Sequence, residues 1–365
     1  MTPDAARLTI DLDALAHNYA VLVAIAGRAE VAPVVKADAY GLGVGPVARR
    51  LWREGARSFF VARIDEGETL RAELGPQRTA DLFVLDGAVA GSMPRLAAAG
   101  LIPVLGSLTQ IEEAAGYART NGVQTVALHI DTGMNRLGLR PEEARAAAGA
   151  SDRFRGLELR LVMSHLACAT DPADPMNARQ AALFRPLAGL FRAARCSLAN
   201  SGGTCLGASF LFDMVRPGIA LYGGAPFERP DARFKAVARL EAPIVQVRAV
   251  APGESIGYGA AFVADRPLRI AIAATGYADG FLRASGPAGG VWFAGQRRRI
   301  TGRVSMDLIS FDVTGCEDAR PGAMVQLLGP DAPLDEAAHA AGTAPHELLV
   351  RLGSRLKRTY VGRGD

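Results

Sequence analysis

Short apolar runs alternate with longer amphipathic segments through the first two thirds of the chain. A strand at 8–10 and a helix from the N-cap Asp11 to Ala26 come first. Runs with the length of buried strands follow at 31–35, 58–62, 82–85, 102–105, 125–130, 157–164, 197–200 and 213–215. Segments of helical period separate them at 46–54, 65–74, 93–99, 108–120, 141–148 and 177–195. Eight such strands, six of them followed by a helical segment, predict an α/β fold, a (β/α)₈ TIM barrel, which is typically about 250 residues long. A doubly wound open sheet is the alternative, because periodicity does not show closure.

The pattern changes near residue 239. Runs such as "EAPIVQVRAV", "LRIAIAATG" and "GAMVQLLG" are short, β-like and separated by glycine and proline turns. We therefore expect the barrel to occupy 1–230 and to be followed by a second, mostly β domain at 239–365, with 227–238 as the linker. Residues 1–10 are free to pair with the second domain.

Composition narrows the class of protein. The 365 residues are 49% hydrophobic and 21% charged, as in ordinary globular proteins, and the net charge of +4 is too small to indicate a nucleic-acid partner. A helix–turn–helix-like segment lies near the C-terminus, but its first helix is acidic and alanine-rich, which disfavours a DNA reader. No apolar run approaches the ~20 residues of a membrane span, and the acidic start has no signal-peptide pattern. The four cysteines form no CxxC pair or metal-ligand spacing, so we expect reduced thiols in a cytoplasmic protein without a metal.

Polar residues follow the predicted barrel strands. In such barrels the catalytic groups lie at the carboxyl ends of the strands and in the loops that follow. A single lysine or histidine at such a place is more often structural, but five separate loops deliver polar groups to the same rim. The residues concerned are Lys36 after the first strand, His129, Asp131 and Arg136 after the fifth, Ser164 and His165 after the sixth, Asn200 and Ser201 after the seventh, and Arg216 and Gly218 after the eighth.

These groups suggest a cofactor. The segments "NSGG" and "RPGIALYGG" supply small residues and a hydroxyl after strands seven and eight, where barrels often bind phosphate. Lys36 could merely snorkel beside its apolar run. At the mouth of a barrel, however, partial desolvation would lower its pKa and free the amine to form an imine. A phosphate site, an imine lysine and an arginine near a ring nitrogen together describe pyridoxal phosphate.

Six motifs in order then give the chain a family resemblance. "VVKADAYGLG", "DTGMNRLG" and "VRPGIALYG" in the barrel, and "IGYGAAF", "GYADGF" and "GRVSMD" in the β domain, are similar to motifs of the bacterial alanine racemases, the barrel-fold class of pyridoxal phosphate enzymes. The resemblance covers essentially the whole chain. It implies an amino-acid racemase, an isomerase that interconverts L- and D-alanine and supplies D-alanine for cell-wall peptidoglycan.

The resemblance also implies a role for each matching residue. Lys36 would hold pyridoxal 5'-phosphate as an internal aldimine and would act with Tyr258, from the other subunit of a homodimer, as the two bases of proton transfer. Arg136 would bind both cofactor and substrate, and Met306 would help to receive the substrate carboxylate. The remaining cofactor contacts would be Tyr40, Ser201, Gly218 and Ile219 at the phosphate, Arg216 at the ring nitrogen, and His165 behind Arg216. Tyr277 and Arg283 would line the corridor to the site.

Two positions depart from the family pattern. Many members carry a lysine, often carbamylated, where this chain has His129, which leaves the support of Arg136 open. Ser354 matches a position that is tyrosine in some members, where it assists phosphate binding. A broader-specificity amino-acid racemase and a non-catalytic pyridoxal phosphate carrier are the alternative readings; the carrier lacks a reason for Tyr258.

Overall fold

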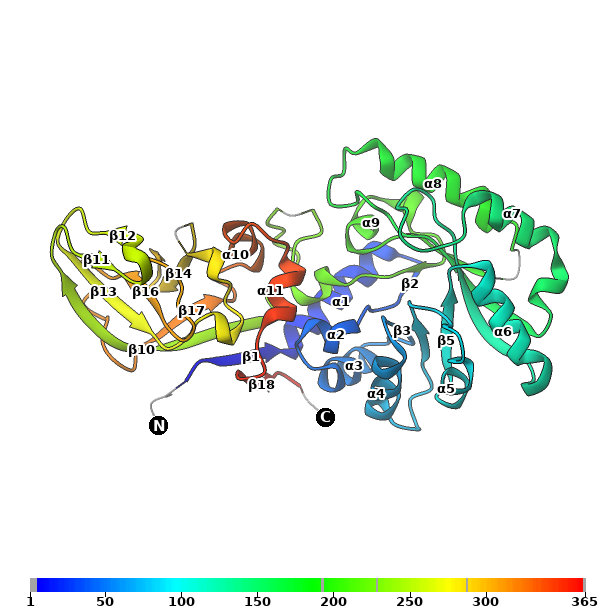
Figure 1. Ribbon diagram of the computed structural model, residues 1–365, viewed down its shortest axis with the longest axis horizontal. Coiled ribbons are helices and arrows are strands. Elements are labelled where there is room, and N and C mark those ends of the chain that lie inside the picture. The colour runs from blue at the N-terminus through cyan, green and yellow to red at the C-terminus, as the bar shows by residue number, and fades with distance from the viewer. Residues whose placement is uncertain (1–4, 192–193, 228, 287, 364–365) are drawn as a thin grey trace.

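The computed structural model describes residues 5–191, 194–227, 229–286 and 288–363. The chain forms an α/β barrel and a separate, mostly β domain beside it (Figure 1). Helix α11 lies where the two parts meet, next to α2 of the barrel (Figure 1). Within the described residues, no helix is long and apolar enough to cross a membrane.

The barrel sheet has eight parallel strands in the order β2-β9-β8-β7-β6-β5-β4-β3. The gap between β2 and β3 is bridged where Val34 pairs with Phe60 and the Val35 N–H donates to the Phe60 carbonyl at 2.9 Å. The predicted barrel is therefore confirmed over the open sheet. Its strands are β2 (Glu30–Val31), β3 (Ser58–Val61), β4 (Asp81–Val84), β5 (Leu101–Leu105), β6 (Gln124–His129), β7 (Leu157–Met163), β8 (Arg195–Ser197) and β9 (Met214–Val215).

The first barrel strand is shorter than the predicted run at 31–35. The apolar run at 31–35 is not one continuous strand, because β2 ends at Val31 and the run then shifts its pairing from β9 to β3. Pro33 has no N–H for a ladder, but its carbonyl accepts from the Phe60 N–H at 2.9 Å. The run therefore closes the barrel, and its apolar side chains are buried on both sides.

Helices cover the outside of the barrel, as expected of βα units. The long predicted helix at 177–195 is wrong beyond Ala188: α8 ends there, Gly189 caps it, and Arg195 begins β8, while residues 192–193 lie outside the described part of the chain. The barrel helices are α1 (Leu12–Ala26), α2 (Lys36–Tyr40), α3 (Val44–Arg53), α4 (Ile64–Leu74), α5 (Met93–Ala98), α6 (Leu108–Asn121), α7 (Pro141–Gly149), α8 (Pro175–Ala188) and α9 (Ser201–Cys205). The short α2 and α9 lie at the carboxyl ends of the strands and not on the outside.

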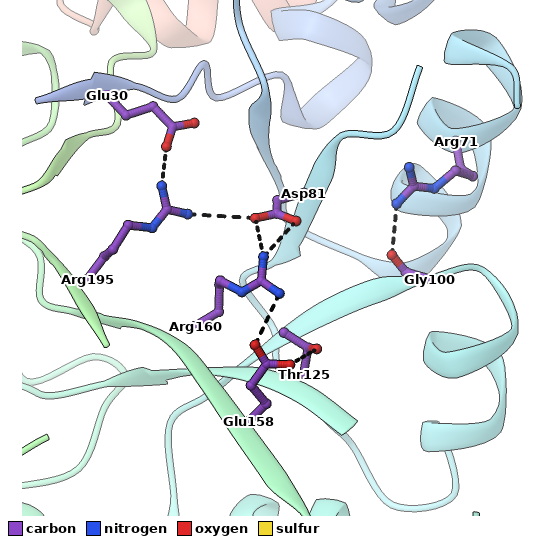
Figure 2. A network of polar contacts seen from close by, with 8 residues as sticks. All are labelled: Glu30, Arg71, Asp81, Gly100, Thr125, Glu158, Arg160 and Arg195. Carbon is purple, nitrogen blue, oxygen red and sulfur yellow. Dashed lines mark hydrogen bonds and ion pairs between the residues drawn. The ribbon is translucent and has the colours of Figure 1, made fainter. Parts of the chain in front are cut away.

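A charged network occupies the amino-terminal end of the barrel strands (Figure 2). Arg195 bonds to Glu30 and lies 3.6 Å from an Asp81 oxygen, while Arg160 contacts Asp81 at 3.2 Å and Glu158 at 3.3 Å. These residues come from β2, β4, β7 and β8, so the network ties the strands together at the end opposite their carboxyl ends.

The second domain is built on a long strand, β10, which pairs with β1, β13 and β17. The N-terminal strand β1 lies between β10 and the C-terminal β18, so both ends of the chain join this sheet. Its elements are β1 (Arg7–Asp11), β10 (Ala238–Val250), β11 (Ser255–Ile256), β12 (Phe262–Val263), β13 (Leu268–Ala273), β14 (Gly290–Phe293), β15 (Gln296–Arg299), β16 (Ile309–Asp312), β17 (Met324–Leu328), α10 (Leu334–Ala340), α11 (Pro345–Arg351) and β18 (Lys357–Val361).

Candidate active site

A cavity of about 290 Å³ opens at the carboxyl ends of the barrel strands. It brings together most of the polar residues that the strand ends predict. Those residues are Lys36, His129, Arg136, His165, Asn200, Ser201, Arg216 and Gly218, and Tyr40 and Ile219, which the family resemblance implied, line the cavity as well. Apolar walls come from Val34, Phe60, Leu85, Leu137, Met163 and Pro226.

The backbone after Lys36 forms a left-handed turn. Ala37, Asp38, Ala39 and Tyr40 all have φ between 52° and 58°, so the turn begins before the glycines that the sequence suggested. Four successive L-residues in this region are costly, since each places its Cβ close to the following carbonyl. The geometry persists only because surrounding groups fix it.

Two carboxylates fix this turn to neighbouring segments. Glu66, in the first turn of α4, accepts from the Ala37 N–H at 2.8 Å and from the Ala62 N–H at 2.7 Å. Asp38 accepts from the Val44 N–H at 2.7 Å, where α3 begins. Glu66 therefore joins the loop that carries Lys36 to the loop that follows β3.

The C-terminal segment fixes the turn from the other side. The Arg358 guanidinium donates to the Gly41 carbonyl at 2.9 and 3.0 Å. The Tyr360 hydroxyl donates to the Leu42 carbonyl at 3.0 Å. A Cβ at Gly41 would lie 2.8 Å from the Leu349 carbonyl oxygen, so α11 packs against backbone there and only glycine fits.

The surroundings of Lys36 favour its neutral amine. Desolvation lowers the pKa of Lys36, and the positive charge of Arg136 adds to the effect, while Glu66 and Asp86 oppose it. A neutral amine is the nucleophilic form, so the arrangement suits imine formation.

Arg216 is a fixed, buried cation. It is 3% exposed, bonds to the Ser197 hydroxyl, and donates to the Ser164 carbonyl at 2.6 Å. It also lies 3.4 Å from His165 Nδ1, which must accept because a guanidinium only donates. Burial lowers the pKa of Arg216 to about 9, so it stays charged at neutral pH. Burial and the charge of Arg216 hold the pKa of His165 well below its usual range.

His129 is uncharged and therefore provides no ionic partner for Arg136. It is 7% exposed, and burial followed by the charge of Arg216 lowers its pKa to about 4, so the imidazole is neutral. No hydrogen bond or ion pair joins Arg136 to another described residue. Asp131, the nearest acid in its loop, is engaged with backbone N–H groups at 133–135. The guanidinium of Arg136 is therefore available to a ligand.

Small residues form a cradle of neutral groups around Ser201. The Ser201 hydroxyl accepts from the Gly218 N–H at 3.0 Å and lies at the start of α9. A Cβ at Gly218 would lie 2.1 Å from the Tyr40 hydroxyl, and one at Gly202 would lie 2.4 Å from the Ala169 carbonyl oxygen. Backbone and hydroxyl groups thus converge closely, as an anion such as phosphate requires.

Several predicted site residues do not reach the cavity within one chain. Tyr258, Met306 and Tyr277 belong to the β domain and are 70%, 53% and 42% exposed. Arg283, from the same domain, is also exposed. Tyr277 and Met306 lie on adjoining segments, since the Tyr277 N–H donates to the Ser305 carbonyl at 3.1 Å. Ser354 is exposed and does not line the cavity.

The cavity also has a residue that sequence reasoning missed. His346, from α11, borders it and packs against Tyr40, with ring centroids 5.8 Å apart. Its segment, "TAPHELLVRLG", shows only the pattern of a helix. The rule that active-site residues follow the carboxyl ends of barrel strands does not place a C-terminal helix beside the first of those strands.

Comparison with known proteins identifies relatives along the whole chain. The family models for the alanine racemase N-terminal and C-terminal domains match residues 10–226 and 237–360. A catabolic alanine racemase of Agrobacterium fabrum is 44% identical and covers 98% of this chain and 92% of its own. An alanine racemase of Methylobacterium sp. strain 4-46 is 46% identical, with 99% of both chains covered.

Solved structures agree with this likeness. The alanine racemase of Bartonella henselae, described with covalently bound pyridoxal phosphate, superimposes with a TM-score of 0.93 at 37% identity over 98% of this chain and 100% of its own. The biosynthetic alanine racemase of Pseudomonas aeruginosa gives a TM-score of 0.91 at 34% identity, covering 98% and 99%.

Proposed function

The chain belongs to the alanine racemase family, and from that premise we propose that it interconverts L- and D-alanine with pyridoxal 5'-phosphate as its cofactor. The observation that supports this most strongly is a convergence in one cavity. The desolvated amine of Lys36, the cradle around Ser201 and the buried guanidinium of Arg216 all line it.

The residues present fit the cofactor. Lys36 would bind it covalently, and Tyr40, Ser201, Gly218 and Ile219 would hold its phosphate in a cradle too tight for an added Cβ at Gly218. When bound, pyridoxal phosphate withdraws electrons from the substrate Cα and so acidifies its proton. The relative from Bartonella, with its covalently bound pyridoxal phosphate, supports the same reading.

Arg216 would set the protonation state of the cofactor's ring nitrogen. Its guanidinium is fixed by the Ser197 hydroxyl and the Ser164 carbonyl, and it donates without giving up a proton. Directed at the ring nitrogen, it would leave that nitrogen unprotonated and moderate the electron demand of the ring. Arg136, which has no partner within the described chain, would take the substrate carboxylate.

Racemisation needs a proton donor and acceptor on each face of the substrate Cα. Lys36 would exchange the proton on one face through its amine. Tyr258 of the partner subunit would serve the other face, because Tyr258 is exposed and lies outside the cavity of its own chain. We therefore propose a homodimer with shared active sites, in which Met306 of the partner subunit helps to receive the carboxylate, and Tyr277 and Arg283 of the partner subunit line the access corridor.

The D-alanine product would supply cell-wall peptidoglycan. The relatives include enzymes described as catabolic and as biosynthetic, and the same proton exchange serves both directions.

Spectroscopy and labelling test the cofactor and its attachment. Purified protein should show the absorption band of a protonated imine, lose it on borohydride reduction, and then carry the label at Lys36. It should also convert L-alanine to D-alanine. A colourless protein that pyridoxal phosphate does not reconstitute would contradict the cofactor, whereas a coloured protein without racemisation would favour a carrier.

Complementation tests the shared site. A heterodimer of Lys36→Ala and Tyr258→Ala chains would contain one site with both residues intact and one with neither, so about half of the wild-type activity should return. Neither homodimer should be active. Verified heterodimers that stay inactive would show that each site comes from one chain.

A further inference from the structure

Helix α11 brings a histidine ring against the phosphate cradle. The His346 and Tyr40 ring centroids are 5.8 Å apart with 39° between the ring planes, and Tyr40 also packs on Tyr222 at 4.7 Å. The Tyr40 hydroxyl lies so close to Gly218 that a Cβ there would be 2.1 Å away. A ring packed on Tyr40 therefore lies beside the cradle.

The imidazole has hydrogen-bonding capacity that the protein does not use. No hydrogen bond joins His346 to any other residue in the described ranges. Desolvation, and then the positive charge of Lys36, lower the pKa of His346, so the ring is neutral at pH 7. A neutral imidazole still has one N–H donor and one acceptor nitrogen. Its donor is available to a group in the cavity.

The cradle itself offers few strong donors to a doubly charged phosphate. Tyr40, Ser201 and Gly218 are neutral, and the Ser201 hydroxyl already accepts from two backbone N–H groups. The tyrosine that family resemblance places at 354 is serine here, and Ser354 is exposed outside the cavity. The C-terminal segment reaches the cavity through His346 instead.

We propose that His346 is a cofactor-binding residue that donates a hydrogen bond to the phosphate of pyridoxal phosphate, a role that rests on the proposed function. The left-handed turn keeps Tyr40 in place, and the packing of α11 on Gly41 keeps His346 against it. The phosphate is thus held from both ends of the chain.

A pair of ligands separates this role from a structural one. Pyridoxal has the ring and aldehyde of the cofactor but no phosphate, so its binding does not sense a phosphate donor. Cofactor-free wild type, His346→Phe, His346→Asn and the control Ser354→Ala would be titrated with both ligands by absorbance. Phenylalanine keeps a ring against Tyr40 without a donor, whereas asparagine keeps a donor without the ring. The phosphorus-31 resonance of bound cofactor gives a second readout.

His346→Phe should weaken pyridoxal phosphate binding about tenfold or more, as expected for a lost bond to a charged group, and should leave pyridoxal within about twofold. The phosphorus resonance should shift, His346→Asn should bind more tightly than His346→Phe, and Ser354→Ala should match wild type. Equal weakening of both ligands, or no change in either, would overturn the proposal. Wild type that binds neither ligand at Lys36 would instead overturn the proposed function.

Discussion

The left-handed turn after Lys36 predicts opposite effects for one substitution at two sites. Ala37 is exposed with φ of 52°, while Ala146 is exposed inside the right-handed helix α7. Both side chains are single methyl groups facing solvent, so Ala→Gly at either place removes little packing. The two variants differ mainly in the backbone region that glycine must occupy.

The expected magnitudes follow from that difference. A left-handed L-residue destabilises the fold by roughly 1–2 kcal/mol, and Ala37→Gly removes this strain. The greater conformational freedom of glycine stabilises the unfolded chain by about 0.5–1 kcal/mol and so offsets part of the gain. Ala37→Gly should therefore raise the free energy of unfolding by about 0.5–1 kcal/mol. Ala146→Gly should lower it by about 1 kcal/mol, the usual cost in a helix. The N–H of residue 37 keeps its bond to Glu66 in the variant.

Urea titration of the cofactor-free proteins measures both free energies without a contribution from ligand binding. Circular dichroism follows unfolding, and the slope with urea should match wild type in both variants. The two free energies should differ by roughly 1.5–2 kcal/mol, the sum of the opposite effects. If Ala37→Gly destabilised the protein as much as Ala146→Gly, the turn would not be strained and the reasoning would fail.

Three further predictions concern titratable and charged side chains in and around the barrel. The pKa of His129 is about 4 in the fold and about 6.5 when unfolded. The unfolded chain therefore binds the proton more strongly between those values, and stability should fall by up to about 3 kcal/mol as pH drops through that window. His129→Gln should remove this part of the pH dependence, measured by urea titrations at pH 7 and below. If the free energy of unfolding of the variant fell with pH as steeply as that of wild type, the prediction would be contradicted. Glu66 raises the pKa of Lys36, so Glu66→Gln should lower that pKa further, measured by the pH dependence of amine acylation in cofactor-free protein; an unchanged or higher pKa would refute the coupling. Arg195→Met should leave the Glu30 carboxylate without its ion-pair partner, and one oxygen of that carboxylate is already buried without a hydrogen bond. For this part-exposed pair the free energy of unfolding should fall by about 1–2 kcal/mol, while kcat and KM stay unchanged. A change in KM instead would mean that the network reaches the site.

The barrel could be predicted because its signal is local and repeated. Each unit carries an apolar run and a helical segment, and the strand-end rule then places Lys36, His165 and Arg216 on one rim without knowledge of any contact. The errors fall where the local signal is weak. After α8 the only stop signal is the single Gly189, and the residues that follow keep a helical apolar pattern, so the sequence favours a helix up to Arg195, whose side chain instead serves the charged network.

Other features depend on contacts between distant segments. The left-handed turn at 37–40 carries no glycine and is fixed by Glu66 and Arg358 from elsewhere in the chain, so local propensity points away from it. His346 reaches the cavity because α11 packs against Gly41, at the end of the turn that follows Lys36, and so brings the imidazole against Tyr40. Neither geometry has a period or spacing in the sequence.

The charges of the cavity bear on substrate choice. Lys36, Arg136 and Arg216 line it, both barrel histidines there are neutral, and none of the lining residues, all in the described chain, is Asp or Glu. A carboxylate in this place would pair with Arg136 and raise the pKa of Lys36, which would weaken both the substrate site and the amine. The same excess of positive charge repels a cationic side chain on the substrate. It therefore disfavours a substrate with a basic side chain, which agrees with the proposed substrate alanine.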